Sequence, residues 1–172
     1  YEKVSQLEDL SLLIDRNHNF WRHTPTIIPL RSRALSDRYG MRKDPFTKKR
    51  EFHGGLDFRA KRGTPVYAPA DGIVRIASRK YGFGLLVELQ HGRGFFPGKK
   101  KSVRYRTRFA HLSKINVRRG QKLKRGDRLG LVGSTGRSTG PHLHYEIIIN
   151  GRRTNPLIPI SKFNPDQRLY LR

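Results

Sequence analysis

The sequence contains no cysteine, few acidic residues and no long apolar run. Without cysteine, the chain can form neither a disulfide nor a zinc site with thiolate ligands. No segment approaches the roughly 18 consecutive apolar residues of a membrane span, and no signal peptide is visible. Because the chain begins at Tyr1 rather than Met, a signal or membrane anchor on its N-terminal side stays an open expectation. A chain of 172 residues is nevertheless long enough to bury a core without covalent cross-links.

Acidic residues are scarce relative to basic ones. The chain has 37 Lys and Arg against 13 Asp and Glu, a formal net charge of +24 at pH 7. Thirteen of the basic residues lie within residues 99–128, together with a single acid, Asp127. Such a surplus favours an anionic partner, such as a wall polymer, a nucleic acid or an acidic lipid surface. The alternative is a solvated basic face that has no partner.

Residues 1–26 are expected to form a helix and a linker. Apolar residues recur at helical spacing over residues 1–16, at Val4, Leu7, Leu10, Leu13 and Ile14. This pattern is typical of the end of a longer helix or coiled coil. Residues 21–29 are predicted to be a linker, because Pro25 and Pro29 exclude a helix interior there.

Residues 27–160 are expected to form one mostly β domain, followed by a tail over residues 161–172. Short β-branched segments separated by glycine turns favour this class. Strands are predicted over residues 65–68, 73–77, 85–90, 107–111, 129–132 and 142–149. Residues 92–106, rich in glycine and basic residues, are predicted to be an extended loop. The chain after Asn155-Pro156 is predicted to be largely irregular.

The segment His53-Gly54-Gly55-Leu56-Asp57 places a histidine and a carboxylate four residues apart. Two adjacent glycines disfavour a helix. In a straight strand the two side chains would lie about 13 Å apart, which is too far for one metal ion. The glycines permit a bend that would let His53 and Asp57 converge. The alternative is a glycine turn that carries both residues by chance.

A second pair, His142 and His144, is separated by one residue in a predicted strand. The strand period of two places both imidazoles on one face, about 7 Å apart at Cα. The other face would carry a core stripe of Leu143, Tyr145, Ile147 and Ile149. A natural division at this spacing is one metal ligand and one neighbour that reaches the substrate or a water molecule. The alternative is a pair of surface histidines.

The other histidines carry weaker signals. His111, in Phe109-Ala110-His111-Leu112, ends a predicted strand, where a lone histidine is usually structural. The sequence gives no partner pattern for His18, His23 or His91, which are interpreted as structural or solvated. The two pairs together still supply histidine and carboxylate ligands. Three such ligands with one open position are the arrangement of a catalytic zinc site.

These motifs occur in the order typical of the lysostaphin-type, or LytM-domain, peptidoglycan endopeptidases, which the chain resembles over residues 27–158. The family carries a His-x-x-x-Asp motif, an Ala-His-Leu motif and a His-x-His motif preceded by a Gly-Ser-Thr-Gly-rich loop, here residues 133–141. Further matching segments are Tyr39-Gly40-Met41-Arg42, Asp44-Pro45, Gly63-Thr64-Pro65-Val66-Tyr67-Ala68, Asp71-Gly72 and Asn155-Pro156. The stretch over residues 92–106 departs from the family, because it is longer and more basic than the usual turn before Ala-His-Leu.

The resemblance implies that His53, Asp57 and His144 bind one zinc ion per chain. It also implies that His111 and His142 assist catalysis, within a compact, barrel-like antiparallel β domain that has an open groove over the zinc. The implied activity is hydrolysis of the peptide cross-links or stem peptides of bacterial peptidoglycan. The expected location is therefore the cell envelope, either periplasmic or extracellular. Peptidoglycan is the expected partner, anionic wall polymers would contact residues 99–128, and a membrane anchor N-terminal to the chain is compatible with this location.

Two other functions stay open at this point. A LytM-like module that is catalytically silent or autoinhibited could activate another wall hydrolase, although all five candidate positions carry the required residue types. A nucleic-acid-binding protein is suggested by charge and by the aromatic residues Phe95, Phe96 and Tyr105 among basic ones. No recognisable nucleic-acid-binding module is present, so no specific nucleic-acid partner is expected.

Overall fold

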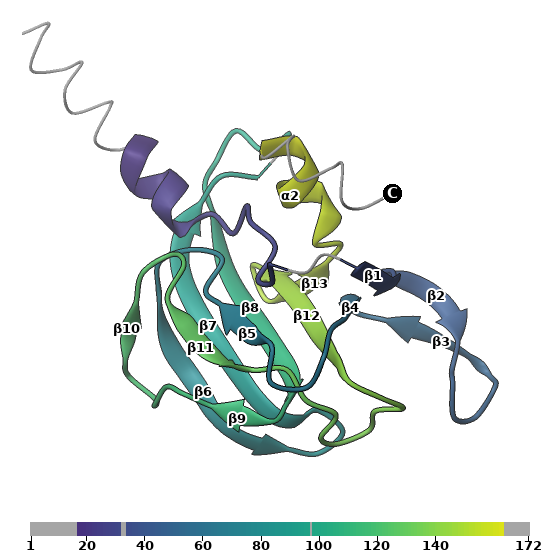
Figure 1. Cartoon of the computed structure of the whole chain (residues 1–172). Coiled ribbons are helices and arrows are strands. Elements are labelled where there is room, and N and C mark those ends of the chain that lie inside the picture. The colour runs from purple at the N-terminus through teal and green to yellow at the C-terminus, as the bar shows by residue number, and fades with distance from the viewer. Residues whose placement is uncertain (1–16, 32–33, 97, 164–172) are drawn as a thin grey trace, which may run out of the picture.

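One large antiparallel sheet forms the framework of the molecule in the computed structural model, which describes residues 17–31, 34–96 and 98–163 (Figure 1). In order across this sheet, the strands are β1 (Ala34–Asp37), β4 (Leu56–Arg59), β12 (His142–Ile149), β8 (Val103–Leu112), β7 (Gly84–Gly94), β6 (Gly72–Lys80) and β10 (Lys122–Leu123), and β13 (Arg152–Thr154) also pairs with β12. Every neighbouring pair runs antiparallel. The predicted mostly β, antiparallel fold is confirmed.

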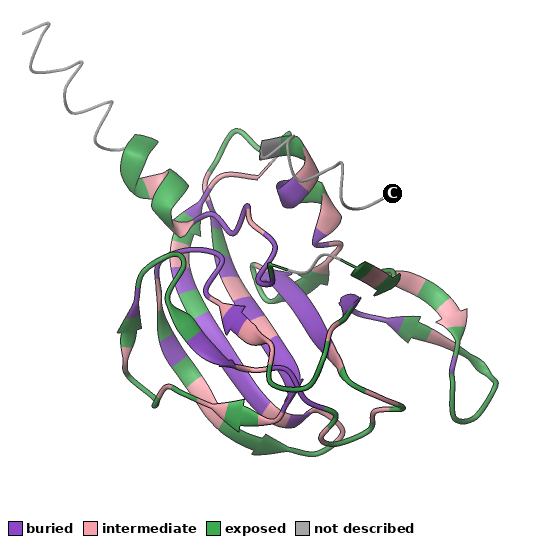
Figure 2. Cartoon of the chain, in the orientation of Figure 1, coloured by how far each residue is buried: buried purple, intermediate pink, exposed green. Residues whose placement is uncertain are grey.

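A small second sheet lies across one face of the large one (Figure 1). Its strands are β5 (Pro65–Tyr67), β11 (Arg128–Leu131) and β9 (Lys114–Ile115). The core contains residues of both sheets, including Phe58, Leu89 and Phe109 from the large one and Val66 and Leu129 from the small one. All five have no exposed surface, and burying each side chain of this size stabilises the fold by about 1.5–3 kcal/mol. In Figure 2 the buried residues follow the strands of both layers.

Strand β12 has the predicted core stripe. Leu143, Tyr145 and Ile147 are fully buried, and Ile149 packs against the same core. Because successive side chains alternate across a strand, His142 and His144 lie on the opposite face. Strand β12 therefore presents both histidines away from the core.

The connection between β7 and β8 is shorter than predicted. Strand β7 continues to Gly94 and β8 begins at Val103, so the loop covers residues 95–102 and the prediction of a loop over residues 92–106 was wrong. In β8, buried residues alternate with less buried arginines at positions 104, 106 and 108. This alternation of a half-buried strand was obscured by the glycine and basic content of the segment.

The C-terminal segment is also more ordered than predicted. A helix, α2 (Leu157–Phe163), follows Asn155-Pro156 in place of irregular chain. The side chain of Asn155 accepts a hydrogen bond from the backbone N–H of Leu157 at 3.1 Å, as an N-terminal cap does. Ile160 is fully buried in the core, which fixes the helix against the sheets.

The N-terminal segment is helical over residues 17–23 and then runs without regular structure to residue 30. The helical pattern predicted over residues 1–16 lies outside the described residues. The helix includes Trp21, so the linker begins later than predicted. The linker packs against the domain, because its residues Thr24 and Thr26 are buried. The Thr24 hydroxyl accepts a hydrogen bond from the backbone N–H of Phe95 at 2.9 Å, and the Arg125 guanidinium donates to the Thr24 carbonyl at 3.0 Å.

Among the described residues, no helix is both long and apolar enough to cross a membrane.

A two-stranded hairpin projects from the edge of the large sheet. It consists of β2 (Gly40–Lys43) and β3 (Arg50–His53), which lead directly into β4 (Figure 1). Met41, Phe46 and Phe52 on this hairpin are exposed. The hairpin places His53 at the end of β3, beside the strand that carries Asp57.

Candidate metal centre

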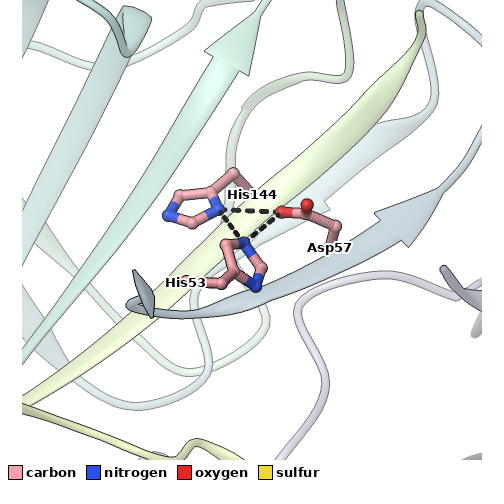
Figure 3. Close-up of side chains that lie close together, drawn as sticks. All are labelled: His53, Asp57 and His144. Atoms are coloured by element: carbon pink, nitrogen blue, oxygen red, sulfur yellow. Dashed lines mark hydrogen bonds and ion pairs between the residues drawn. The ribbon is translucent and has the colours of Figure 1, made fainter. Parts of the chain in front are cut away.

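Three side chains from three different strands converge on one point. His53 comes from β3, Asp57 from β4 and His144 from β12 (Figure 3). Oδ1 of Asp57 lies 3.1 Å from Nε2 of His53 and 2.8 Å from Nδ1 of His144, and these two nitrogens are 3.1 Å apart. Tetrahedral ligands of a zinc ion lie roughly 3.3 Å from one another, given metal–ligand bonds of about 2.0–2.1 Å. The three atoms are thus close to the spacing of one metal site.

Strand pairing and two glycines bring these residues together. Asp57 and His144 are direct partners in the register of β4 and β12. Gly54-Gly55 separates β3 from β4, so His53 and Asp57 belong to two different strands. The bend that was expected at these glycines is therefore present. Gly55 is required for close approach, since a side chain there would collide with the carbonyl oxygen of Tyr145 and press on the His144 ring.

The remaining ring nitrogens fix how the two histidines face the centre. Nδ1 of His53 lies 2.8 Å from the carbonyl oxygen of Arg38, which can only accept a hydrogen bond. Nε2 of His144 lies 3.1 Å from Oε1 of Glu146, a carboxylate that is 1% exposed. Each ring therefore donates one N–H outward and turns its other nitrogen to the centre. Metal-binding histidines typically have this second partner, so the residues fit a bound metal ion.

The second oxygen of Asp57 is also held. Oδ2 accepts a hydrogen bond from Nη1 of Arg42 at 3.2 Å, and Arg42 in turn pairs with Asp37 and with Glu51. Burial by itself would raise the pKa of Asp57, but hydrogen bonds from His144 and His53 hold this pKa well below its usual range. Asp57 is therefore a carboxylate at neutral pH, with Oδ1 left to face a cation.

Burial by itself would lower the pKa of His144. Hydrogen bonds to Asp57 and Glu146 outweigh this effect and raise it to about 9. Binding of a metal ion at Nδ1 must displace the proton from that nitrogen. The same carboxylates that favour the proton would also favour a divalent cation in its place.

His111 and His142 lie side by side next to the three converging residues. Their ring centroids are 4.7 Å apart, and Nε2 of His142 lies 3.9 Å from Oδ1 of Asp57. Nδ1 of His111 donates to the carbonyl of Thr135 at 2.7 Å, and Nδ1 of His142 donates to the carbonyl of Gly140 at 2.8 Å. These contacts select the tautomer with the proton on Nδ1, in which Nε2 is the nitrogen that can accept a proton.

The backbone and the environment of His111 are unusual. Its φ of 59° lies in the left-handed region, which a non-glycine residue seldom adopts. Burial lowers the pKa of His111 to about 4. The imidazole is therefore neutral near pH 7, which is the form that can take up a proton.

An open groove of about 1000 Å³ runs over the centre. The hairpin contributes Phe46 and Phe52 to one wall, and the loop after β11 contributes residues 137–141 to another. All five predicted site residues line this groove. The described residues that line the groove all follow residue 33, so residues 17–31 do not cover it.

All five predicted site residues come together, whereas the other histidines lie elsewhere. His18 is exposed, and His91 is 1% exposed, between the carbonyl of Asp71 and the hydroxyl of Thr107. Sequence reasoning missed Arg42 and Glu146. The period of two in β12 could have identified Glu146, because it is on the same face as His144.

Comparison with known proteins gives a consistent result. The sequence pattern of Peptidase family M23 matches residues 51–156. The chain is 44% identical over 131 residues to peptidoglycan DD-endopeptidase ShyA of Vibrio cholerae, covering 74% of this chain and 28% of that protein. The chain spans about a quarter of the length of the curated relatives it matches.

Solved structures have the same fold. A zinc-containing peptidase from Vibrio cholerae aligns with a TM-score of 0.63 and 34% identity, covering 75% of this chain and 38% of that one. The catalytic domain of lysostaphin from Staphylococcus simulans aligns with a TM-score of 0.60 and 30% identity, covering 78% and 91%. The matched pattern, which contains His53, Asp57, His111, His142 and His144, shows that the chain belongs to peptidase family M23.

Proposed function

We propose that the chain is a zinc-dependent endopeptidase that hydrolyses the peptide cross-links or stem peptides of bacterial peptidoglycan in the cell envelope. One observation carries the proposal: three ligand atoms converge at 2.8–3.1 Å beneath an open groove, and two further imidazoles flank them. Peptidoglycan is named as the substrate of the relative ShyA. The set of five filled positions supports an enzyme over a silent module.

His53, Asp57 and His144 would hold the zinc ion. When bound, zinc supplies Lewis-acid catalysis, because it lowers the pKa of a water molecule and polarises a peptide carbonyl. Asp57 contributes a hard, negatively charged oxygen, and Arg42 on Oδ2 leaves Oδ1 for the ion. Two neutral imidazoles and one carboxylate leave a position open for catalysis.

His111 and His142 would move protons. Each holds its Nδ1 proton against a backbone carbonyl, so Nε2 can accept the proton of the attacking water. The same nitrogen can then donate to the amine that leaves as the C–N bond breaks. The protonated ring also stabilises the negative charge that develops on the carbonyl oxygen. The division of these roles between the two histidines stays a prediction.

A soluble substrate tests this proposal. The purified chain is incubated with a cross-linked dimeric muropeptide, and products are separated and weighed by mass spectrometry. Wild type with about one zinc per chain is expected to release two monomers from the dimer. A chelator is expected to stop this release, and added zinc is expected to restore it. Intact dimer in the presence of bound zinc would contradict the proposal.

A further inference from the structure

The face of the large sheet that is turned away from the small sheet is rich in arginine (Figure 1). Tyr105, Thr107 and Phe109 of β8 are fully buried, so the arginines that alternate with them lie on the other face of the sheet. The register of the neighbouring strands adds residues of β6, β7 and β13 to this surface. This arginine face consists of six residues, Arg75, Arg93, Arg104, Arg106, Arg108 and Arg153.

Two carboxylates neutralise only part of this charge. Glu88 and Glu146 are the acidic residues of β6, β7, β8, β12 and β13. Glu88 is 1% exposed and pairs with Arg75 at 3.6 Å, Arg106 at 3.2 Å and Arg108 at 2.6 Å. The three guanidiniums share one buried carboxylate, so they are held against the sheet and keep a surplus of positive charge. Groups that are already fixed lose less entropy when they bind an anion.

Arg93 and Arg104 have no acidic partner. They are opposite each other in the register of β7 and β8, and both are exposed. Neither forms an ion pair with any residue in the part of the chain that the structure describes. Like charges that are directly opposite each other destabilise a sheet. The pair therefore favours an anionic ligand, which would remove this repulsion.

The arginine face is continuous with the groove over the metal centre. Glu146 and Arg153 line the groove, and Glu146 is opposite Arg108 in the register of β12 and β8. From there the arginines of β8 continue to Arg104, over about 13 Å of strand. A ligand on this face would therefore lie beside the groove and outside it.

The spacing of the charges favours an extended polymer. Along β8 the arginines repeat every two residues, about 6.6–7 Å, and neighbouring strands are about 4.8 Å apart. A small anion can contact only one or two of these groups, whereas a polymer with a charge on each unit engages several at once. A phosphodiester carries its charge within the polymer backbone, so a row of phosphates can follow a row of arginines. Guanidinium groups bind phosphate through two parallel hydrogen bonds.

The aromatic residues that suggested a nucleic acid lie elsewhere. Tyr105 is fully buried. The Phe95 ring packs on Phe20 and Trp21, with ring centroids 5.1 and 5.2 Å apart, and Phe96 packs against the core. Bases would find no stacking partner among these residues. The face therefore favours a polymer whose phosphates join sugar or polyol units.

We infer that the arginine face binds a phosphodiester polymer of sugar or polyol units in the cell envelope and holds the peptidase beside its substrate, an inference that rests on the proposed peptidase function. The polymer is a ligand and is not cleaved. Its phosphates contact the guanidinium groups, and the groove stays open for the peptide.

Binding of a synthetic glycerol phosphate oligomer tests this inference. The test variant combines Arg75→Gln, Arg93→Gln and Arg104→Gln. The control combines Arg118→Gln, Arg119→Gln and Lys124→Gln, which remove the same charge at exposed positions outside the arginine face. At about 50 mM salt the test variant should bind roughly tenfold or more weakly than wild type, and its slope of log K against log salt should be smaller by about two. An equal loss in both variants, or no loss in the test variant, would overturn the inference.

A single-stranded oligonucleotide with the same number of phosphates tests the choice of polymer. The glycerol phosphate oligomer is expected to bind at least as tightly, because bases find no stacking partner. A preference of roughly tenfold or more for the oligonucleotide, the effect of stacking a single base, would overturn the assignment to a polymer without bases. Vesicles of anionic phospholipid are the third probe, and loss of vesicle binding in the test variant with unchanged oligomer binding would assign the face to a membrane surface instead.

Activity separates this inference from the proposed function. The test variant should cleave the soluble muropeptide dimer at the wild-type rate, because Arg75, Arg93 and Arg104 do not line the groove. It should digest sacculi that carry a phosphodiester polymer more slowly than wild type does. Equal digestion of these sacculi, or loss of dimer cleavage in the test variant, would contradict the role of the face in holding the enzyme beside its substrate. If wild type cleaves no dimer, the proposed function fails, while oligomer binding still decides whether the face binds phosphate.

Discussion

Glu146 accepts a hydrogen bond from Nε2 of His144 at 3.1 Å, on the side of the imidazole opposite Asp57. The carboxylate is 1% exposed and also contacts Arg108 at 3.4 Å and Arg153 at 3.7 Å. It thereby fixes the ring so that Nδ1 faces the metal centre. Glu146 is a positioning residue, because it acts through His144 and its role is visible in metal affinity.

Glu146→Gln should lower zinc affinity by about 10- to 100-fold, the usual cost of losing a partner of a metal-binding histidine. The measurement is a competition titration against a chromophoric chelator. Glu88→Gln is the control, since Glu88 is equally buried and shares Arg108 but does not contact His144. Wild-type zinc affinity in Glu146→Gln would show that the contact does not position the ligand.

His142 and His144 are expected to respond differently to removal, although both face the centre. His144→Ala deletes a ligand atom and should abolish stoichiometric zinc binding. His142→Ala should keep about one zinc per chain and lower kcat by a factor of about 10² to 10⁴, the usual contribution of a general acid or base. Zinc content is read by elemental analysis and kcat with the muropeptide dimer. Loss of zinc in His142→Ala alone would mean that the two roles are exchanged.

Acid should destabilise the fold through His91. Burial lowers its pKa from 6.5 to about 4, so the native state favours the neutral ring. The neutral His91 ring thus contributes to the free energy of unfolding above pH 6.5, and this contribution is lost as pH falls toward 4. The loss amounts to about 3 kcal/mol at most. Denaturant unfolding at several pH values measures it.

The variant His91→Gln should be less stable near pH 7, since it loses the packing and hydrogen bonds of His91, but its stability should fall less steeply with acid. Part of the slope should persist, because burial also lowers the pKa of His111 to about 4. His18→Gln, at an exposed position, should behave as wild type. An identical slope in His91→Gln and wild type would refute the assignment.

The basic loop between β7 and β8 should contribute to wall binding. Lys99, Lys100 and Lys101 are exposed, and replacing all three by serine should weaken sedimentation with wall sacculi in low salt and flatten the salt dependence. High salt should remove the difference from wild type, because exposed charges are screened. Sacculi stripped of anionic polymers are the matched control. Unchanged binding in low salt would leave these lysines as a solvated face.

The sequence allowed the site residues to be predicted better than their arrangement. His53 and Asp57 could be named from a glycine-broken motif, and His142 and His144 from a strand period of two. The pairing of Asp57 with His144 depends on strands separated by more than 80 residues, and no local pattern encodes it. Arg42 was hidden for the same reason, since its contact with Asp57 arises only when the hairpin folds back.

The errors in the fold have specific causes. Glycine and basic residues obscured the ends of β7 and β8, because cross-strand pairing there outweighs local propensity. The helix α2 could have been found from Asn155-Pro156, which combines an N-terminal cap with a proline suited to the first turn. The end of the N-terminal helix could not be predicted from the sequence, because contacts of Thr24 with the rest of the domain set it.

Digestion of purified peptidoglycan sacculi, with and without a zinc chelator, tests the central claim most directly. Products are identified by mass spectrometry, and His142→Ala is digested in parallel. The account predicts chelator-sensitive release of stem or cross-link peptides by wild type, restored by zinc and slower by a factor of about 10² to 10⁴ in His142→Ala. Sacculi left intact by zinc-loaded wild type, or release that continues in the chelator, would contradict it.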